Sequence, residues 1–299
     1  MNRRRAGFTL VELLVVAGLM AVLFALVLAG GPAGGQMATA RRAAQEFASM
    51  LLAAQSRALG KPEGAAVIVE AAADAPRLGT VIHEAVGLPP VVVTVTSGSL
   101  AANTQLSQAY KARFRMPAGT GFATISPWLK LQNQQPVRRL SAGQTAANTL
   151  IVPPAAEEAV VARYPVMGPR PVKLAATVAI DLRHSGVGDD PAALHGHGEF
   201  EEGGPVALVF DQTGRVAEVI QQVGMAGGPP VEPVVPSEPI YFLFADRQAI
   251  TAEEALASNA SFWVAVNPQT GRINVSSNEP AAGLTAARAK ARQGIAIGK

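Results

Sequence analysis

The sequence predicts an α+β fold, a long N-terminal helix followed by an antiparallel β-sheet domain. The first 60 residues contain two helical segments, whereas the pattern from residue 64 onward is strand-like and rich in Val, Ile and Phe. No second long helix alternates with these strands, which disfavours a doubly wound parallel sheet. With 299 residues, of which 49% are hydrophobic and 16% charged, the chain can bury a substantial core.

A transmembrane helix is expected over residues 8–29, which are apolar almost throughout. A helix of this length measures about 33 Å, close to the hydrocarbon thickness of a bilayer. Three arginines at residues 3–5 precede the run, and no charge follows it until Arg41, so the N-terminus is expected in the cytoplasm. An ordinary signal peptide is the alternative. The small-residue stretch at 30–35 fits one, but the apolar core exceeds the usual length of about 7–15 residues.

Glu12 places a carboxylate inside this apolar run. A charged side chain at the centre of a membrane helix costs on the order of 2.5–3.5 kcal/mol or more, and such residues mark functional sites by default. A plain membrane anchor explains the length of the segment but leaves Glu12 unexplained.

Residues 3–16, RRRAGFTLVELLVV, closely resemble the leader of type IV prepilins and type II secretion pseudopilins. The resemblance implies that residues 1–7 are a leader peptide, which prepilin peptidase removes after Gly7 on the cytoplasmic side. It also implies that the new terminal amine, on Phe8, is methylated. The protein would then be a single-pass inner-membrane protein with a periplasmic C-terminal domain. Its partners would be other pilin or pseudopilin subunits and an inner-membrane assembly platform, and it could enter a periplasmic or surface filament.

Cleavage would place an ammonium on Phe8, one helical turn from Glu12. Two opposite charges about 4 Å apart attract by roughly 4 kcal/mol at an effective dielectric near 20, which offsets much of the desolvation cost. Glu12 could pair with the amine of its own chain or, as the resemblance implies for filaments, with that of a neighbouring subunit. The second pairing would set the register of assembly, as a lone polar group does in a coiled coil.

A hinge and an amphipathic helix are expected over residues 30–60. The GGPAGG stretch at residues 30–35 is predicted to interrupt the helix, which resumes at about residue 36 and ends near residue 59. Gly60 and Pro62 supply the stop signal. The resemblance implies that this helix packs on the β domain. Its predicted apolar face consists of Phe47, Leu51, Ala54 and Ala58.

The predicted β domain covers residues 64–280, with an insertion rich in Pro, Gly and Gln at about 84–170. Residues 227–239 are expected to form an extended, polyproline-like connector. Residues 281–299 form a basic C-terminal tail, either frayed or a short helix. The predicted strands are residues 66–70, 91–96, 112–116, 149–152, 172–182, 206–210, 215–223, 240–244, 262–266 and 272–276.

Two turns share the sequence QTGR, at residues 212–215 and 269–272, and each is expected to join two strands as a hairpin. The segments around them, LVFDQTGRV and FWVAVNPQTGRINV, resemble H-type pseudopilins and FimT-like minor pilins, as does ARRAAQEFASMLLAAQSRALG in the stem. This second resemblance implies a minor pilin-like structural subunit of a type II secretion pseudopilus or a type IV pilus.

A FimT-like minor pilin that binds DNA for uptake is the alternative function. The formal net charge is +3, but removal of residues 1–7 leaves 22 basic and 22 acidic residues, so DNA binding would need a local basic patch. Two groups of residues could supply one: Lys111, Arg113 and Arg115, or Arg288, Lys290 and Arg292.

Catalytic and metal chemistry are not expected. The chain has no cysteine and no phosphate-binding, zinc-protease, hydrolase or dinucleotide-binding motif, so we predict neither an enzyme nor a cofactor. His195, His197 and Glu199 are the best candidate metal ligands. The Gly-rich segment 185–204 that holds them is better interpreted as a solvated polar loop.

Overall fold

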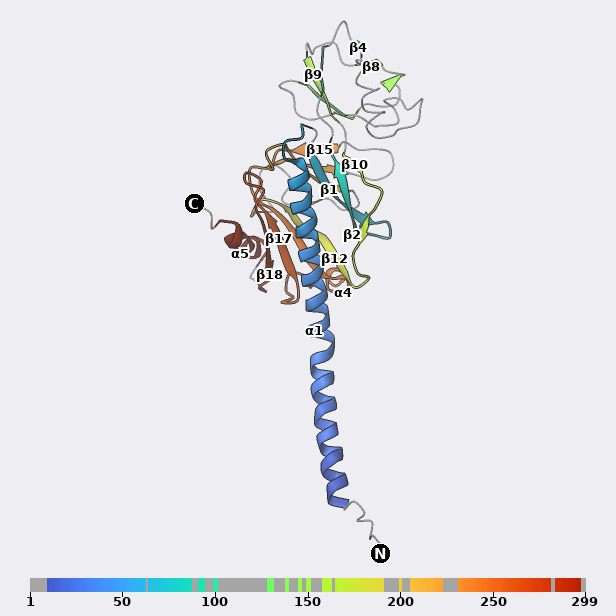
Figure 1. The fold of residues 1–299 in the computed structure, drawn as a ribbon, viewed down its shortest axis with the longest axis vertical. Coiled ribbons are helices and arrows are strands. Elements are labelled where there is room, and N and C mark those ends of the chain that lie inside the picture. The colour runs from blue at the N-terminus through green and yellow to red at the C-terminus, as the bar shows by residue number, and fades with distance from the viewer. Residues whose placement is uncertain are drawn as a thin grey trace, which may run out of the picture.

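The computed structural model describes residues 10–62, 64–87, 165–190, 199–200, 205–222, 231–280 and 283–296, together with seven short strands between residues 91 and 162. One long helix, α1, lies along the large sheet and projects far beyond it toward the N-terminus (Figure 1). The antiparallel α+β class predicted from the sequence is confirmed.

Helix α1, Leu10–Ala58, is continuous over 49 residues, so the expected interruption at residues 30–35 does not occur. Each glycine costs about 1 kcal/mol and a proline about 3 kcal/mol in a helix interior. Continuing the helix nevertheless avoids a second nucleation, although Pro32 removes its own N–H donor and its ring crowds the carbonyl four residues earlier.

The predicted apolar face of α1 is confirmed. Phe47, Leu51, Ala54 and Ala58 are at most 1% exposed, and the buried stripe begins at Ala40. The polar side chains of the same stretch lie on the solvent side: Arg41, Arg42, Gln45, Glu46 and Ser49. This periodicity of apolar positions presses the helix against the sheet.

The large sheet has the strand order β15-β14-β13-β1-β2-β12-β16-β17-β18, and all of its pairs are antiparallel. Two further strands, β10 (Val166–Met167) and β11 (Val172–Lys173), pair with β2. The main strands are β1 (Ala65–Ala72), β2 (Ala75–Val86), β12 (Val178–Val187), β13 (Val206–Phe210), β14 (Val216–Gln222), β15 (Val231–Val234), β16 (Ile240–Asp246), β17 (Phe262–Val266) and β18 (Ile273–Ser277).

Most predicted strands of this sheet are found within one or two residues of their ends, and those at 206–210 and 262–266 match β13 and β17. Residues 172–182 instead divide into β11 and β12. Strand β2 was not predicted, and β15 forms inside the expected connector at 227–239. The predicted strand at 112–116 lies outside the described residues.

The short strands between residues 91 and 162 form two small sheets, drawn above the large sheet in Figure 1. They lie within the predicted insertion at 84–170, whose role stays a prediction. The first sheet has the order β3 (Val91–Thr94), β9 (Glu158–Ala162), β5 (Trp128–Leu131) and β6 (Arg138–Arg139). The second has the order β4 (Ser99–Ala101), β8 (Thr149–Ile151) and β7 (Thr145–Ala146).

The large sheet buries both of its faces. Alternate residues of β17 point to opposite sides, so Val264 joins the core beneath α1 while Trp263 joins a second core on the other face. The short helix α4 (Arg247–Thr251) and α5 (Leu284–Ala296) contribute to that second core. Of the two alternatives for residues 281–299, the structure therefore shows a packed helix over most of the segment rather than a frayed tail.

Candidate functional site

The N-terminal half of α1 projects from the β domain as an isolated apolar helix (Figure 1). From residue 10 to the first residue of the buried stripe at Ala40 the helix extends about 45 Å at 1.5 Å per residue. Five large apolar side chains on it are 52–63% exposed: Leu14, Val15, Val16, Leu19 and Met20. A contiguous exposed apolar surface of this kind marks a contact with a partner or a membrane.

Glu12 lies in the first turns of this helix, and its side chain is outside the described residues, as are Gly7 and Phe8. The assignment of cleavage and methylation to Gly7 and Phe8, and of assembly to Glu12, therefore stays a prediction. Among the residues whose side chains the structure describes, no helix is long and apolar enough to cross a bilayer.

The opposite end of α1 is fastened by the two QTGR turns, which the fold brings side by side. The amide of Gln55 donates from Nε2 to the carbonyl of Gly214 at 2.9 Å and to that of Thr270 at 3.5 Å. The turns also bond directly, from Val216 N to Pro268 O at 3.0 Å. We call Gln55 with the turns at 211–216 and 267–272 the clasp.

The clasp depends on side-chain caps in both turns. The carboxylate of Asp211 accepts hydrogen bonds from the backbone of Thr213 and Arg215. Burial alone would raise the pKa of Asp211, but these bonds, the Thr213 hydroxyl and the Arg215 charge together lower it. Asn267 caps the second turn in the same way, accepting from the backbone N–H groups of residues 269 and 270. These Asx caps fix the carbonyl positions that Gln55 contacts.

An ion pair joins the last turn of α1 to the sheet beside the clasp. Arg57 contacts both carboxylate oxygens of Glu84 on β2, at 2.8 and 2.5 Å. The hydrogen bond from Arg57 and its charge hold the pKa of Glu84 below its usual range, although partial burial acts in the opposite direction. The positive charge at this helix end also interacts favourably with the helix dipole.

Gln55 was not predicted as a contact residue, although the sequence around it carries two signals. Gln55 lies four residues after Leu51 and three before Ala58, at the border of the apolar stripe. The repeated QTGR sequence was predicted only to form two hairpin turns, with no contact between them. Its two copies are in fact neighbours in space, joined through one helix residue.

The candidate metal ligands do not form a described site. His195 and His197 lie outside the described residues, and Glu199 is exposed. No group of three or more potential ligands occurs among the described residues. The expected solvated loop at 185–204 is partly wrong, because Ser185 and Phe200 are buried and the Phe200 ring packs 5.5 Å from that of Phe242.

One of the two candidate basic patches for DNA is already engaged within the protein. Arg288 is fully buried, Lys290 pairs with Glu279, and Arg292 pairs with Asp189. The other candidate patch, Lys111, Arg113 and Arg115, lies outside the described residues.

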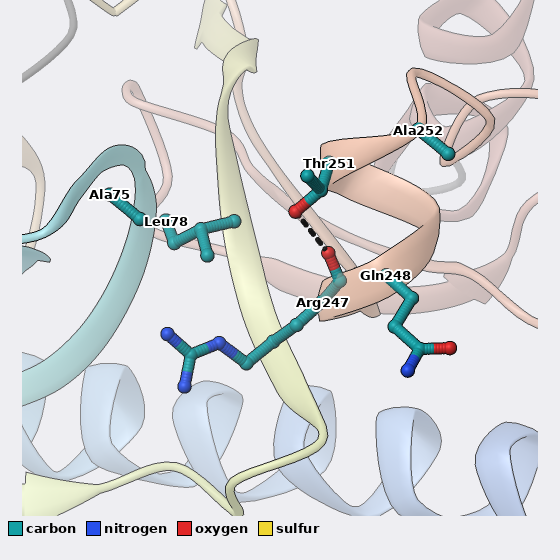
Figure 2. A pocket seen from close by; sticks show the side chains of 6 residues that line it. All are labelled: Ala75, Leu78, Arg247, Gln248, Thr251 and Ala252. Carbon is teal, nitrogen blue, oxygen red and sulfur yellow. Dashed lines mark hydrogen bonds between the residues drawn. The ribbon is translucent and has the colours of Figure 1, made fainter.

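An open pocket of about 480 Å³ lies between the turn that begins β2 and helix α4 (Figure 2). Leu78 and Arg247 approach it from opposite sides, and the Thr251 hydroxyl donates to the carbonyl of Arg247 at 2.8 Å. The lining residues are Ala75, Leu78, Arg247, Gln248, Thr251 and Ala252. These six supply one guanidinium and one amide but no carboxylate or imidazole, so the pocket lacks an acid–base pair for catalysis.

Residues 2–28 match the family model described as the prokaryotic N-terminal methylation motif. No curated protein and no solved structure matches the chain. The matched segment includes Gly7, Phe8 and Glu12, and it supports a type IV pilin-like or pseudopilin subunit. The motif implies processing by prepilin peptidase, assembly with other pilins and a membrane anchor at the N-terminus. The antiparallel α+β arrangement behind one long helix is consistent with a pilin-like fold.

Proposed function

We propose that the chain is a minor pilin-like structural subunit of a type II secretion pseudopilus or a type IV pilus, related to H-type pseudopilins and FimT-like minor pilins. Prepilin peptidase cuts after Gly7 and methylates Phe8. The subunit then waits in the inner membrane with its β domain in the periplasm. The observation that carries the proposal is the methylation motif at residues 2–28, at the start of a helix that projects alone from the β domain.

The exposed apolar side chains of α1 support assembly through this helix. The side chains of Leu14, Val15, Val16, Leu19 and Met20 are more than half exposed on the projecting part of α1. From Ala40 onward, one face of the helix is buried against the β domain. The two halves therefore have different partners: the β domain of the same chain for one, and the lipid or neighbouring helices for the other. The role is structural rather than catalytic, in agreement with the absence of catalytic motifs from the sequence.

Glu12 acts in assembly, by pairing with the methylated amine of a neighbouring Phe8. In an apolar environment, desolvation of either charge alone costs much free energy, whereas attraction between the two paired charges offsets much of that cost. Only one axial offset between two helices brings the pair together, so the pair selects the register.

The experiment compares two carboxylates on the same helix in a host that assembles the filament. Glu12→Gln should leave membrane insertion and cleavage after Gly7 intact but reduce incorporation into the filament at least tenfold. Glu46→Gln is the matched control, because Glu46 is exposed on the solvent side of the domain-bound half. Incorporation of Glu12→Gln at the wild-type level would refute the role of Glu12.

The processing step is tested by mass spectrometry of the mature N-terminus. A methylated Phe8 is expected, and deletion of prepilin peptidase should leave residues 1–7 attached. A mature end beyond residue 29 would show an ordinary signal peptide and would contradict the proposal.

A further inference from the structure

Helix α5 covers the sheet face opposite α1 with little apolar surface of its own. Ala287 and Ala291 are 3% and 2% exposed, and Leu284 is partly buried beside them. Beneath lie Tyr241 and Trp263, two large aromatic side chains at most 1% exposed, with their rings edge-on at 6.2 Å. Alanine is the smallest apolar side chain that can cover such a surface, so α5 itself contributes little apolar area to this contact.

The main attachment of α5 is a buried cation. Arg288 is 0% exposed and donates from Nη1 to the carbonyl of Gly188 at 2.9 Å and from Nη2 to that of His184 at 2.8 Å. Its guanidinium lies 5.5 Å from the centre of the Tyr241 ring. Burial lowers the pKa of Arg288 to about 10, against the opposing charge of Glu199, so the group is protonated at neutral pH. A buried charge of this kind requires its acceptors.

The His184 acceptor is available because β12 bulges, whereas Gly188 lies just beyond the end of the strand. Its pairing with β16 shifts between Asp181 and Gly186, so the intervening residues leave the ladder. Ser185 stabilises the bulge, because its hydroxyl donates to the carbonyl of Asp181 at 2.6 Å and accepts from Leu243 N at 3.0 Å. The His184 carbonyl lies in this unpaired stretch and is therefore free to accept from α5.

Further polar contacts link α5 to the residues that follow the bulge. Arg292 pairs with Asp189 at 2.5 Å, and the same carboxylate accepts from the Tyr241 hydroxyl at 2.5 Å. Lys290 pairs with Glu279 at the surface. Gly283 precedes the helix with a φ of 153°, a conformation that favours glycine, and a Cβ there would meet nothing within 4 Å.

We propose that α5 is a detachable strap that opens as a unit when the hydrogen bonds from Arg288 to Gly188 and His184, which we call the Arg288 latch, break. Opening uncovers Tyr241 and Trp263 and releases residues 186–190. Helix α1 and the sheet stay folded. Opening exchanges the two charged hydrogen bonds of Arg288 for hydration of its guanidinium, and it exposes the apolar surface of Tyr241 and Trp263 while the core beneath α1 stays buried. Opening of α5 therefore requires less free energy than global unfolding, as for other weakly packed terminal units. The inference is independent of the role of the chain in a filament.

Hydrogen exchange of the full-length chain in detergent micelles tests the strap. Amides of residues 284–296 should exchange at least tenfold faster than those of β16. Arg288→Met keeps most of the side-chain volume. This variant should accelerate hydrogen exchange of α5 and of residues 186–190 at least tenfold further, without changing the exchange rate of β16. In a Trp128→Phe background Trp263 is the remaining tryptophan, and it should become accessible to acrylamide.

Two controls separate the latch from general destabilisation. Lys290→Gln removes a surface pair and should change exchange of α5 less than about twofold. Arg292→Gln should have an intermediate effect. If Arg288→Met does not fold, two other measurements test the proposal. Arg292→Gln should accelerate hydrogen exchange of α5 but not of β16. In the wild type, raising NaCl from about 0.05 to about 0.5 M should likewise accelerate exchange of α5 alone, because salt screens its outer ion pairs. The proposal would be overturned if α5 and β16 exchanged at one common rate, or if Arg288→Met accelerated exchange of α5 no more than Lys290→Gln does.

Discussion

Substitution of Gly271 by alanine should loosen the clasp between α1 and the two QTGR turns. Gly271 has a φ of 66°, a conformation that costs a residue with a Cβ about 1–2 kcal/mol. A Cβ at this position would lie 2.0 Å from Nε2 of Gln55 and 2.2 Å from the carbonyl oxygen of Gly214. The first contact can be relieved by moving a side chain, whereas the second requires movement of the backbone.

The expected loss of stability has three sources. Backbone strain contributes about 1 kcal/mol, and expulsion of the Gln55 amide removes its bond to Gly214, worth about 1 kcal/mol. Displacement of the neighbouring turn disturbs the bond from Val216 N to Pro268 O, which is worth a similar amount. We therefore expect Gly271→Ala to lower the free energy of unfolding by about 3 kcal/mol.

Gly60→Ala is the matched control for this substitution. Gly60 has a φ of 72°, but a Cβ there would meet nothing within 4 Å, so only strain of about 1 kcal/mol is expected. The two variants are compared by thermal unfolding of the full-length chain, in which 1 kcal/mol lowers Tm by about 2–4 °C. Equal Tm losses in the two variants would refute the clasp as a source of stability.

Three further predictions concern the core and the surface. Phe47→Ala should destabilise by about 3–5 kcal/mol in chemical denaturation, because the ring is fully buried. Asn278→Ala should cost about 2–4 kcal/mol by leaving Trp263 Nε1 unpaired, with a matching loss of exchange protection in residues 252–261. The pKa of Glu84 is lowered in the folded state, so its ion pair with Arg57 stabilises the folded protein at pH values above the unfolded-state pKa of Glu84. This stabilisation is lost as the pH falls through the folded-state pKa. Arg57→Gln should remove this acid-dependent part, at most about 1 kcal/mol because the pair is half-exposed, in unfolding titrations from pH 7 to 3.

Local patterns predicted the elements whose signals are contained in a few residues. The apolar stripe of α1 and the fully buried runs of β13 and β17 follow from spacing and composition alone. The methylation motif is likewise confined to residues 2–28, which is why roles for Gly7, Phe8 and Glu12 could be predicted from the sequence.

Strand β2 was missed because two of its residues usually interrupt strands. Pro76 and Gly79 lie within its first half. Gly79 is required by packing rather than by a turn, since a Cβ there would lie 2.7 Å from Cγ1 of Val69 on β1. A glycine that permits close approach of two strands cannot be distinguished in sequence from one that ends a strand.

The contacts of Arg288 and Gln55 were missed because they are distant in sequence. Arg288 finds its acceptors 100 and 104 residues away, and Gln55 finds its own 159 and 215 residues away. In the sequence, Arg288 lies among alanines and other cations in a segment that is typical of a solvated tail. Only the fold supplies the carbonyl groups that allow the charge to be buried.

The continuity of α1 connects the proposed assembly site to the β domain. Phe47 fixes the axial position of the helix, because its ring lies 5.0 Å from that of Phe242 and 5.4 Å from that of Phe244. Glu12 lies about 52 Å away along the same helix, at 1.5 Å per residue. A helix broken at residues 30–35 would let the domain reorient freely, whereas a continuous one would convert the offset that we propose Glu12 selects into a defined position of the whole domain. On this proposal, the register of the membrane segment sets the spacing of the β domains along a filament.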